Sequence, residues 1–134
     1  MTRYLLDTNI LSALMRDPRG RVLDKIEAVG RAKIYTSVIV AAELRFGAAK
    51  RKSAGLAKEV EAFLGRLPVS PIEPPLDRVY ADVRSDLEGR GEVIGANDLL
   101  IACQAYRDGS VVVTDNVREF SRVKGLRVEN WLRE

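Results

Sequence analysis

Four acidic residues of this chain stand where strands or helices can deliver their side chains to one place. Asp7 directly follows a short apolar run, and Asp115 follows another run of the same kind near the end of the chain. Glu43 and Asp98 each lie beside apolar stretches typical of buried helices. Crowded carboxylates cannot all stay ionised without a cation, and a site of oxygen ligands alone selects Mg²⁺ or Mn²⁺. The four acids therefore indicate metal-assisted hydrolysis, provided that the fold brings them together.

The composition removes most other hydrolytic chemistry. The chain has no histidine, which excludes Ser-His-Asp and Cys-His nucleophile pairs, histidine-ligated zinc and histidine acid/base catalysis. Its one cysteine, Cys103, excludes an internal disulfide and a cysteine-clustered zinc site. Lys and Arg total 22 against 19 acids, a net charge of +3, which modestly favours a polyanionic partner. An acidic centre in a basic protein is consistent with hydrolysis of a phosphodiester by carboxylates and a hard metal ion.

The elements that must position these acids alternate between strands and helices. Strands are predicted at 4–6, 33–36, 67–72, 110–114 and 126–129, the third of them irregular because of its prolines. Helices are predicted at 10–15, 18–29, 38–50, 54–64 and 76–88, from 97 onward, and briefly around 119–120. The glycine-rich stretch 89–95 is predicted to be a plain connector. This alternation predicts an α/β fold with a mainly parallel central sheet flanked by helices on both sides.

A parallel sheet gives the acids a common location. The carboxyl ends of its strands share one edge, and ligands bind at that edge in open α/β folds. Asp7, Asp115 and the helix starts near Ser37 and Asn97 are all expected there. Taken alone, each acid also has a structural explanation: a helix cap, a pair with an arginine, or a favourable place in a helix dipole. Their convergence on one edge is what favours a shared functional role.

The length of the chain bounds its organisation. A chain of 134 residues suits one domain, predicted here as residues 1–134. No apolar run approaches the roughly 18 residues that span a bilayer. Residues 1–3 lead straight into the first strand, without a signal-peptide segment. We therefore expect a cytoplasmic protein with no membrane partner.

Four motifs, in this order, resemble those of the PIN domain family. They are YLLDTNIL at 4–11, AEL at 42–44 with Gly47, NDLLIA at 97–102, and VTDN at 113–116 with Phe120. The closing GLRVENW at 125–131 is similar to the bacterial VapC-type toxins within that family. The resemblance covers essentially the whole chain. It implies a single PIN-like domain that acts as an endoribonuclease dependent on Mg²⁺ or Mn²⁺.

The same resemblance implies partners. It implies RNA as substrate, a homodimer, and a small antitoxin that is encoded beside the toxin and neutralises it. The apolar faces of the helix after Asp17 and of the helix from Ala54 exceed what a small core needs, which fits a dimer. The antitoxin is expected to lay an apolar helix along a groove and to present an arginine to the carboxylates.

Three acids carry the family's metal-binding positions directly. Asp7, Glu43 and Asp98 match the three recurrent metal-binding acids of the family. A PIN-like module that binds RNA or a partner without cleavage is the alternative, and the loss of one of these acids would have favoured it. An aspartyl phosphotransfer protein with Asp7 as nucleophile is a second alternative, but its usual second aspartate is replaced here by Asn9.

The fourth acidic position is ambiguous. Many relatives place the last acid two residues after the strand threonine, Thr114, where this chain has Asn116. Asp115 comes one residue earlier, and its charge suits a divalent cation better. On that ground Asp115 is preferred as the fourth catalytic and metal-binding residue, with Asn9, Thr114 and Asn116 as auxiliary polar residues.

Overall fold

A five-stranded sheet forms the centre of the computed structural model, which describes residues 1–133. Its strands are β1 (Tyr4–Leu6), β2 (Ile34–Ser37), β3 (Val69–Ser70), β4 (Val111–Val113) and β5 (Arg127–Glu129), in the spatial order β3-β2-β1-β4-β5. Neighbouring strands are parallel, and Leu5 of β1 lies opposite both Tyr35 of β2 and Val112 of β4. The predicted mainly parallel α/β sheet is confirmed.

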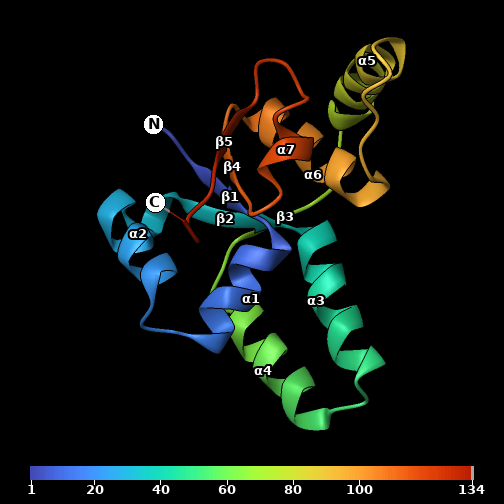
Figure 1. The fold of residues 1–134 in the computed structure, drawn as a ribbon. Coiled ribbons are helices and arrows are strands. Elements are labelled where there is room, and N and C mark those ends of the chain that lie inside the picture. Colours follow the sequence, from blue (N-terminus) through green and yellow to red (C-terminus); the bar gives the residue numbers. More distant parts are fainter. Residues whose placement is uncertain (134) are drawn as a thin grey trace.

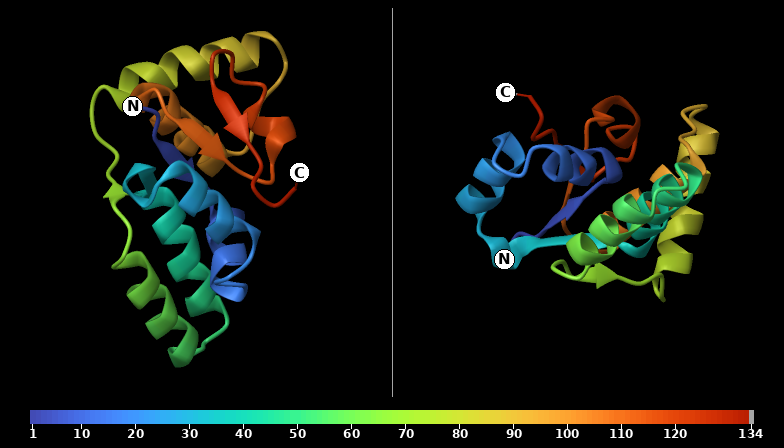
Figure 2. Two further views of the ribbon diagram at one scale, coloured as in Figure 1. Left: turned by 90° about the vertical axis from the view of Figure 1, so that its left-hand side faces the viewer. Right: turned by 90° about the horizontal axis from the view of Figure 1, so that it is seen from below.

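Two groups of helices cover the sheet (Figure 1). Their bounds are α1 (Thr8–Arg16), α2 (Arg21–Val29), α3 (Val38–Lys50), α4 (Ala54–Leu64), α5 (Leu76–Gly89), α6 (Ala96–Asp108) and α7 (Val117–Phe120). In the view of Figure 1, α1, α3 and α4 lie below the strands and α5, α6 and α7 lie above them. Figure 2 shows α3 and α4 packed side by side. No helix within residues 1–133 is both long and apolar enough to span a membrane.

The middle strands are short apolar runs because both of their faces are covered. Leu5, Leu6 and Val112 are fully buried, as a strand between two helical layers requires. Trp131 closes the core beside β1, and its ring centroid lies 5.4 Å from that of Tyr4. The central sheet is therefore a rigid support for whatever follows its strands.

The strand order creates a crevice at one edge of the sheet. The chain runs outward from β1 to β2 and β3 and then crosses to β4, on the other side of β1. The segments that leave the carboxyl ends of β1 and β4 therefore diverge, and open α/β sheets bind ligands at such a point. Asp7 follows β1 there, and residues 114–116 follow β4.

The starts of α1 and α2 differ from the predicted ones. α1 begins at Thr8 instead of residue 10, because Asp7 caps it by accepting a hydrogen bond from the Thr8 N–H. Pro18, expected in the first turn of the second helix, lies before it, and α2 begins at Arg21. The Gly20 N–H donates to the carbonyl of Asp17 at 3.1 Å, which closes a turn around the proline.

Candidate functional site

Asp7 is the most deeply buried acid at the crevice, with 3% of its surface exposed. One carboxylate oxygen accepts from the Thr8 N–H at 2.8 Å, and the other accepts from the Thr114 hydroxyl at 2.8 Å. Burial raises the pKa of Asp7, the two hydrogen bonds oppose that rise, and the charge of Glu43 adds to it. Asp7 is therefore both a helix cap and a desolvated carboxylate close enough to Glu43 for the two charges to repel.

Glu43 comes to the same place from α3. Its carboxylate accepts hydrogen bonds from the Thr8 hydroxyl and, at 3.4 Å, from the Asn97 side-chain amide. The neighbouring Arg45 turns instead to Glu61 on α4, with its Nε 2.7 Å from a Glu61 oxygen. Arg45 therefore pairs with Glu61 and is not the ion-pair partner that would give Glu43 a purely structural role.

Asp98 lies in the first turn of α6 and is partly buried. One of its oxygens accepts from the Asn116 side-chain amide at 3.0 Å. Burial is the main cause that raises the pKa of Asp98 to about 6, and the charges of Asp7 and Glu119 contribute to the rise. The three acids matched to the family motifs are thus brought together, close enough for their charges to interact.

Glu119 joins this group, although the sequence did not single it out. It lies in the one-turn helix α7, and its carboxylate accepts from the same Asn116 amide group that donates to Asp98. That hydrogen bond is the main cause of a lowered pKa at Glu119, and a bond from the Gly95 N–H acts in the same direction. The signal was present in the spacing, since Glu119 follows Asn116 by three residues and so shares its side of a helical turn.

Asp115 does not face the other acids. Its side chain is exposed, and one of its oxygens accepts from the Asn130 amide at 2.9 Å and lies 3.5 Å from Nε of Arg133. Its N–H donates to the Asn9 side chain at 3.0 Å, which fixes the turn. The turn after β4 thus aims Asp115 outward and Asn116 toward Asp98, which favours Asn116 as the residue that lies beside the other acids.

The donor set fits a hard divalent cation in its chemistry. Within residues 1–133, no three acids are placed closely enough to chelate one ion as they stand. Neutral groups separate them: the Thr8 hydroxyl at Glu43, the Thr114 hydroxyl at Asp7, and the Asn116 amide at Asp98. All donors are oxygens, and the repulsion between the acids is what a cation relieves. Side-chain rotations would therefore be needed to gather three carboxylates around one ion.

Comparison with known proteins places this chain in a family. The PIN domain model matches residues 4–126. A protein of Haemophilus influenzae named Ribonuclease VapC2 is 34% identical over 134 residues, which cover 98% of this chain and 100% of that protein. The tRNA(fMet)-specific endonuclease VapC of Shigella flexneri is 32% identical, over 98% of this chain and 99% of the relative. The crystal structure of VapBC2 from Rickettsia felis, bound to a DNA fragment from their promoter, contains a chain that superposes with a TM-score of 0.89 at 33% identity, covering 97% of this chain and 99% of the other.

Proposed function

This chain belongs to the PIN domain family and, within it, to the VapC ribonucleases, and from that premise we propose its function. We propose that it is the toxin of a toxin–antitoxin pair and that it cleaves RNA with the help of Mg²⁺ or Mn²⁺. The observation that carries the proposal is the meeting of Asp7, Glu43 and Asp98 at the crevice between β1 and β4. The chain keeps all three acids, so we favour cleavage over the alternative of a binding module without activity.

The proposed metal ligands are the carboxylates of the crevice. Asp7, Glu43 and Asp98 are assigned as ligands, and Glu119 replaces Asp115 as the fourth acid. When bound, the ion supplies a water of lowered pKa and stabilises the charge that develops on the phosphate oxygens. The chain's own groups orient the acids. The Thr114 hydroxyl holds the second oxygen of Asp7, and the Asn116 amide donates to both Asp98 and Glu119, which are also hydrogen-bonded to each other.

RNA cleavage tests this function directly. Wild-type protein with Mg²⁺ or Mn²⁺ is expected to cut RNA, and a chelator is expected to stop it. Asp7→Asn keeps an acceptor for the Thr8 N–H, so the helix cap and the fold should survive while cleavage is lost. Circular dichroism is the control for folding. Cleavage by Asp7→Asn at the wild-type rate would show that the site lies elsewhere, and RNA binding by wild-type protein without cleavage would favour the non-cleaving module.

A groove between helices α1, α2 and α4 suits the antitoxin. A cavity of about 540 Å³ lies between α1, α2 and α4, with Leu14, Ile26 and Phe63 in its wall and Arg31 and Glu59 among its charged residues. The groove includes the apolar faces of α2 and α4, from which the sequence predicts a dimer. We propose that an apolar helix of the antitoxin fills this groove and that an antitoxin arginine reaches the carboxylates in place of the metal. Ala62 is an exposed residue of α4 in the wall of this groove, so Ala62→Asp should abolish co-purification with a co-expressed antitoxin and leave RNA cleavage intact.

A different surface suits the homodimer. Val38 and Phe46 on α3 are 38% and 66% exposed, and Ala42 lies between them on the same helix face. An apolar stripe of this kind is typical of an interface between copies. We propose that a second copy of the chain packs on it. Sedimentation should show a dimer for wild type and a monomer for Phe46→Asp, and a wild-type monomer at micromolar concentration would contradict the proposal.

A further inference from the structure

The glycine-rich segment between α5 and α6 leaves α5 through a final turn in which the Glu92 N–H donates to the Leu87 carbonyl at 2.9 Å. Residues 90–95 have no regular structure, and Gly91 adopts a positive φ of 67°. Gly89 and Gly95 stand at the two ends of the segment. Glycine restricts the backbone least of all residues, so contacts with the rest of the fold must fix this segment. Its path matters, because it leads directly into the turn of α6 that carries Asp98.

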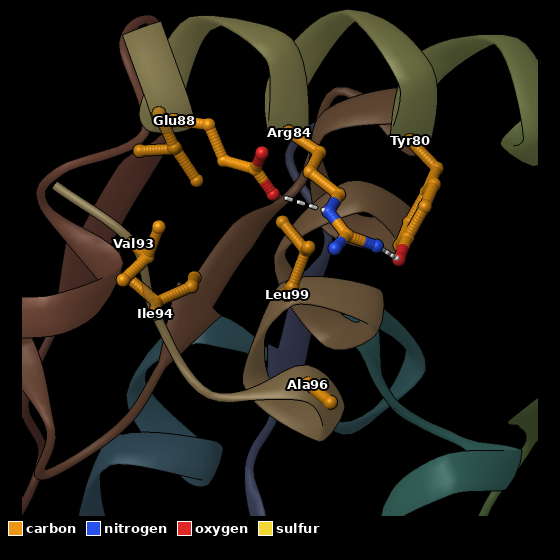
Figure 3. Close-up of a pocket in the computed structure, with 8 residues that line it drawn as sticks. Tyr80, Arg84, Glu88, Val93, Ile94, Ala96 and Leu99 are labelled. Atoms are coloured by element: carbon orange, nitrogen blue, oxygen red, sulfur yellow. Dashed lines mark hydrogen bonds and ion pairs between the residues drawn. The ribbon is translucent and has the colours of Figure 1, made fainter. Parts of the chain in front are cut away.

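One side of the segment faces a cavity. A cavity of about 200 Å³ separates it from α5, and Val93 and Ile94 form part of the wall, as Figure 3 shows. Arg84 on the α5 side is held by its own helix, because it donates to Glu88 and to the Tyr80 hydroxyl. Ile94 packs against the core and Val93 is 59% exposed, so packing on this side fixes the segment at Ile94 and leaves Val93 to other contacts.

Two arginines hold the other side. Arg90 donates to the backbone carbonyl of Arg122 at 2.6 Å, and Arg122 donates in return to the backbone carbonyl of Val93 at 2.7 Å. Asp86 orients Arg90, with one carboxylate oxygen 2.7 Å from Nη2. We call the hydrogen bond from Arg90 to the Arg122 carbonyl and the one from Arg122 to the Val93 carbonyl the arginine clasp. It ties the segment before α6 to the residues that follow α7.

The clasp joins the two segments that deliver acids to the site. Arg122 follows Glu119 by three residues, and Val93 precedes Asp98 by five. Between the clasp and the acids, the Gly95 N–H donates to the Glu119 carboxylate, and the Asn116 amide links Glu119 with Asp98. We propose that Arg90 and Arg122 are positioning residues that set the spacing of Asp98 and Glu119 for metal binding. This inference rests on the function proposed above.

The experiment compares Arg122→Ala with Arg84→Ala as a matched control. Both variants lose one positive charge beside the same segment, but only Arg122→Ala opens the clasp. Arg122→Ala is expected to weaken Mn²⁺ binding roughly tenfold in calorimetry, as loss of groups that orient metal ligands commonly does. In metal-free protein it should also speed hydrogen exchange of the amides at 93–97. Arg84→Ala should change neither measurement by more than about twofold.

Charge alone predicts the opposite result, which makes the test sharp. Removing a positive charge near a cation site favours the cation. A loss of Mn²⁺ affinity in Arg122→Ala therefore reports geometry, and Arg122→Lys, which keeps the charge and one donor, should recover part of it. Arg90→Gln is the second variant and should act in the same direction. If wild type binds Mn²⁺ and both clasp variants bind it equally well, the positioning role is wrong. If wild type binds none, the proposed metal function fails, and the clasp proposal fails with it.

Discussion

Acidic side chains at the two edges of the sheet are neutralised in different ways. At the edge where the strands begin, the Asp108 carboxylate lies 3.0 Å from the Arg107 guanidinium and accepts from the Tyr35 hydroxyl at 2.8 Å. At the edge where they end, neutral hydroxyl and N–H groups donate to Asp7, and Asp98 is hydrogen-bonded to the Asn116 amide and to a second acid, Glu119. One edge is compensated internally and is structural. The other keeps its negative charge, and that is the edge we assign to a divalent ion.

Removing Arg107 should destabilise the edge where the strands begin and leave the acids at the opposite edge unaffected. Arg107 is 11% exposed and also donates to the carbonyl of Glu73. Arg107→Ala leaves Asp108 partly buried without its partner, which should cost about 2–4 kcal/mol in the free energy of unfolding. Urea denaturation measures this cost, and Arg45→Ala, which breaks the exposed pair with Glu61, should cost less than about 1 kcal/mol. Arg107→Ala should leave the rate of RNA cleavage per folded molecule unchanged. A loss of cleavage in this variant would contradict the separate roles of the two edges.

Substitutions within the turn after β4 sharpen the comparison at single-residue scale. Asn116→Ala removes the amide between Asp98 and Glu119, and Glu119→Gln removes the fourth charge. Each should slow RNA cleavage by roughly 10–100-fold, since both affect how the ligands are held. Asp115→Asn should cleave at nearly the wild-type rate, because Asp115 faces Asn130. An inactive Asp115→Asn beside a fully active Asn116→Ala would restore the preference drawn from the sequence.

The pH dependence of stability should reveal the uncompensated charge. The pKa of Asp98 rises from 3.8 to about 6 on folding, so the folded state holds its proton more tightly than the unfolded chain does. Metal-free stability should therefore fall as pH rises through that window. Asp98→Asn should reduce the fall, and the remainder comes from Asp7, whose pKa burial also raises. Above pH 6 the metal-free variant should be more stable than wild type by on the order of 1–2 kcal/mol, after allowance for solvent screening. Near pH 4 the two should be alike, and equal stabilities across the whole range would contradict the account.

The convergence of acids was predictable because it follows from topology. A chain that alternates strands and helices forms a parallel sheet, and the ends of its strands share an edge whatever the side chains are. Asp7, placed directly after β1, could therefore be assigned to the crevice from the sequence. The same rule located the start of α6 and, with it, Asp98.

The direction of single side chains in a turn was not predictable. Asp115 points outward because its N–H bonds to Asn9 and its carboxylate to Asn130, and both partners are distant in the sequence. In the sequence, Glu119 looks like an ordinary surface acid. In the structure, the single turn of α7 brings its carboxylate to the Asn116 amide. Local pattern reports which elements form, whereas contacts between distant residues decide where each side chain points.

Calorimetric titration with Mn²⁺ tests the central claim most directly, because it measures whether the uncompensated edge binds a divalent ion. We predict saturable binding to wild type at millimolar concentration or below, with a matching rise in melting temperature. Asp98→Asn should weaken binding at least tenfold, whereas Asp115→Asn should bind as wild type does. Absence of binding to folded wild-type protein, or equal binding by Asp98→Asn, would contradict the account.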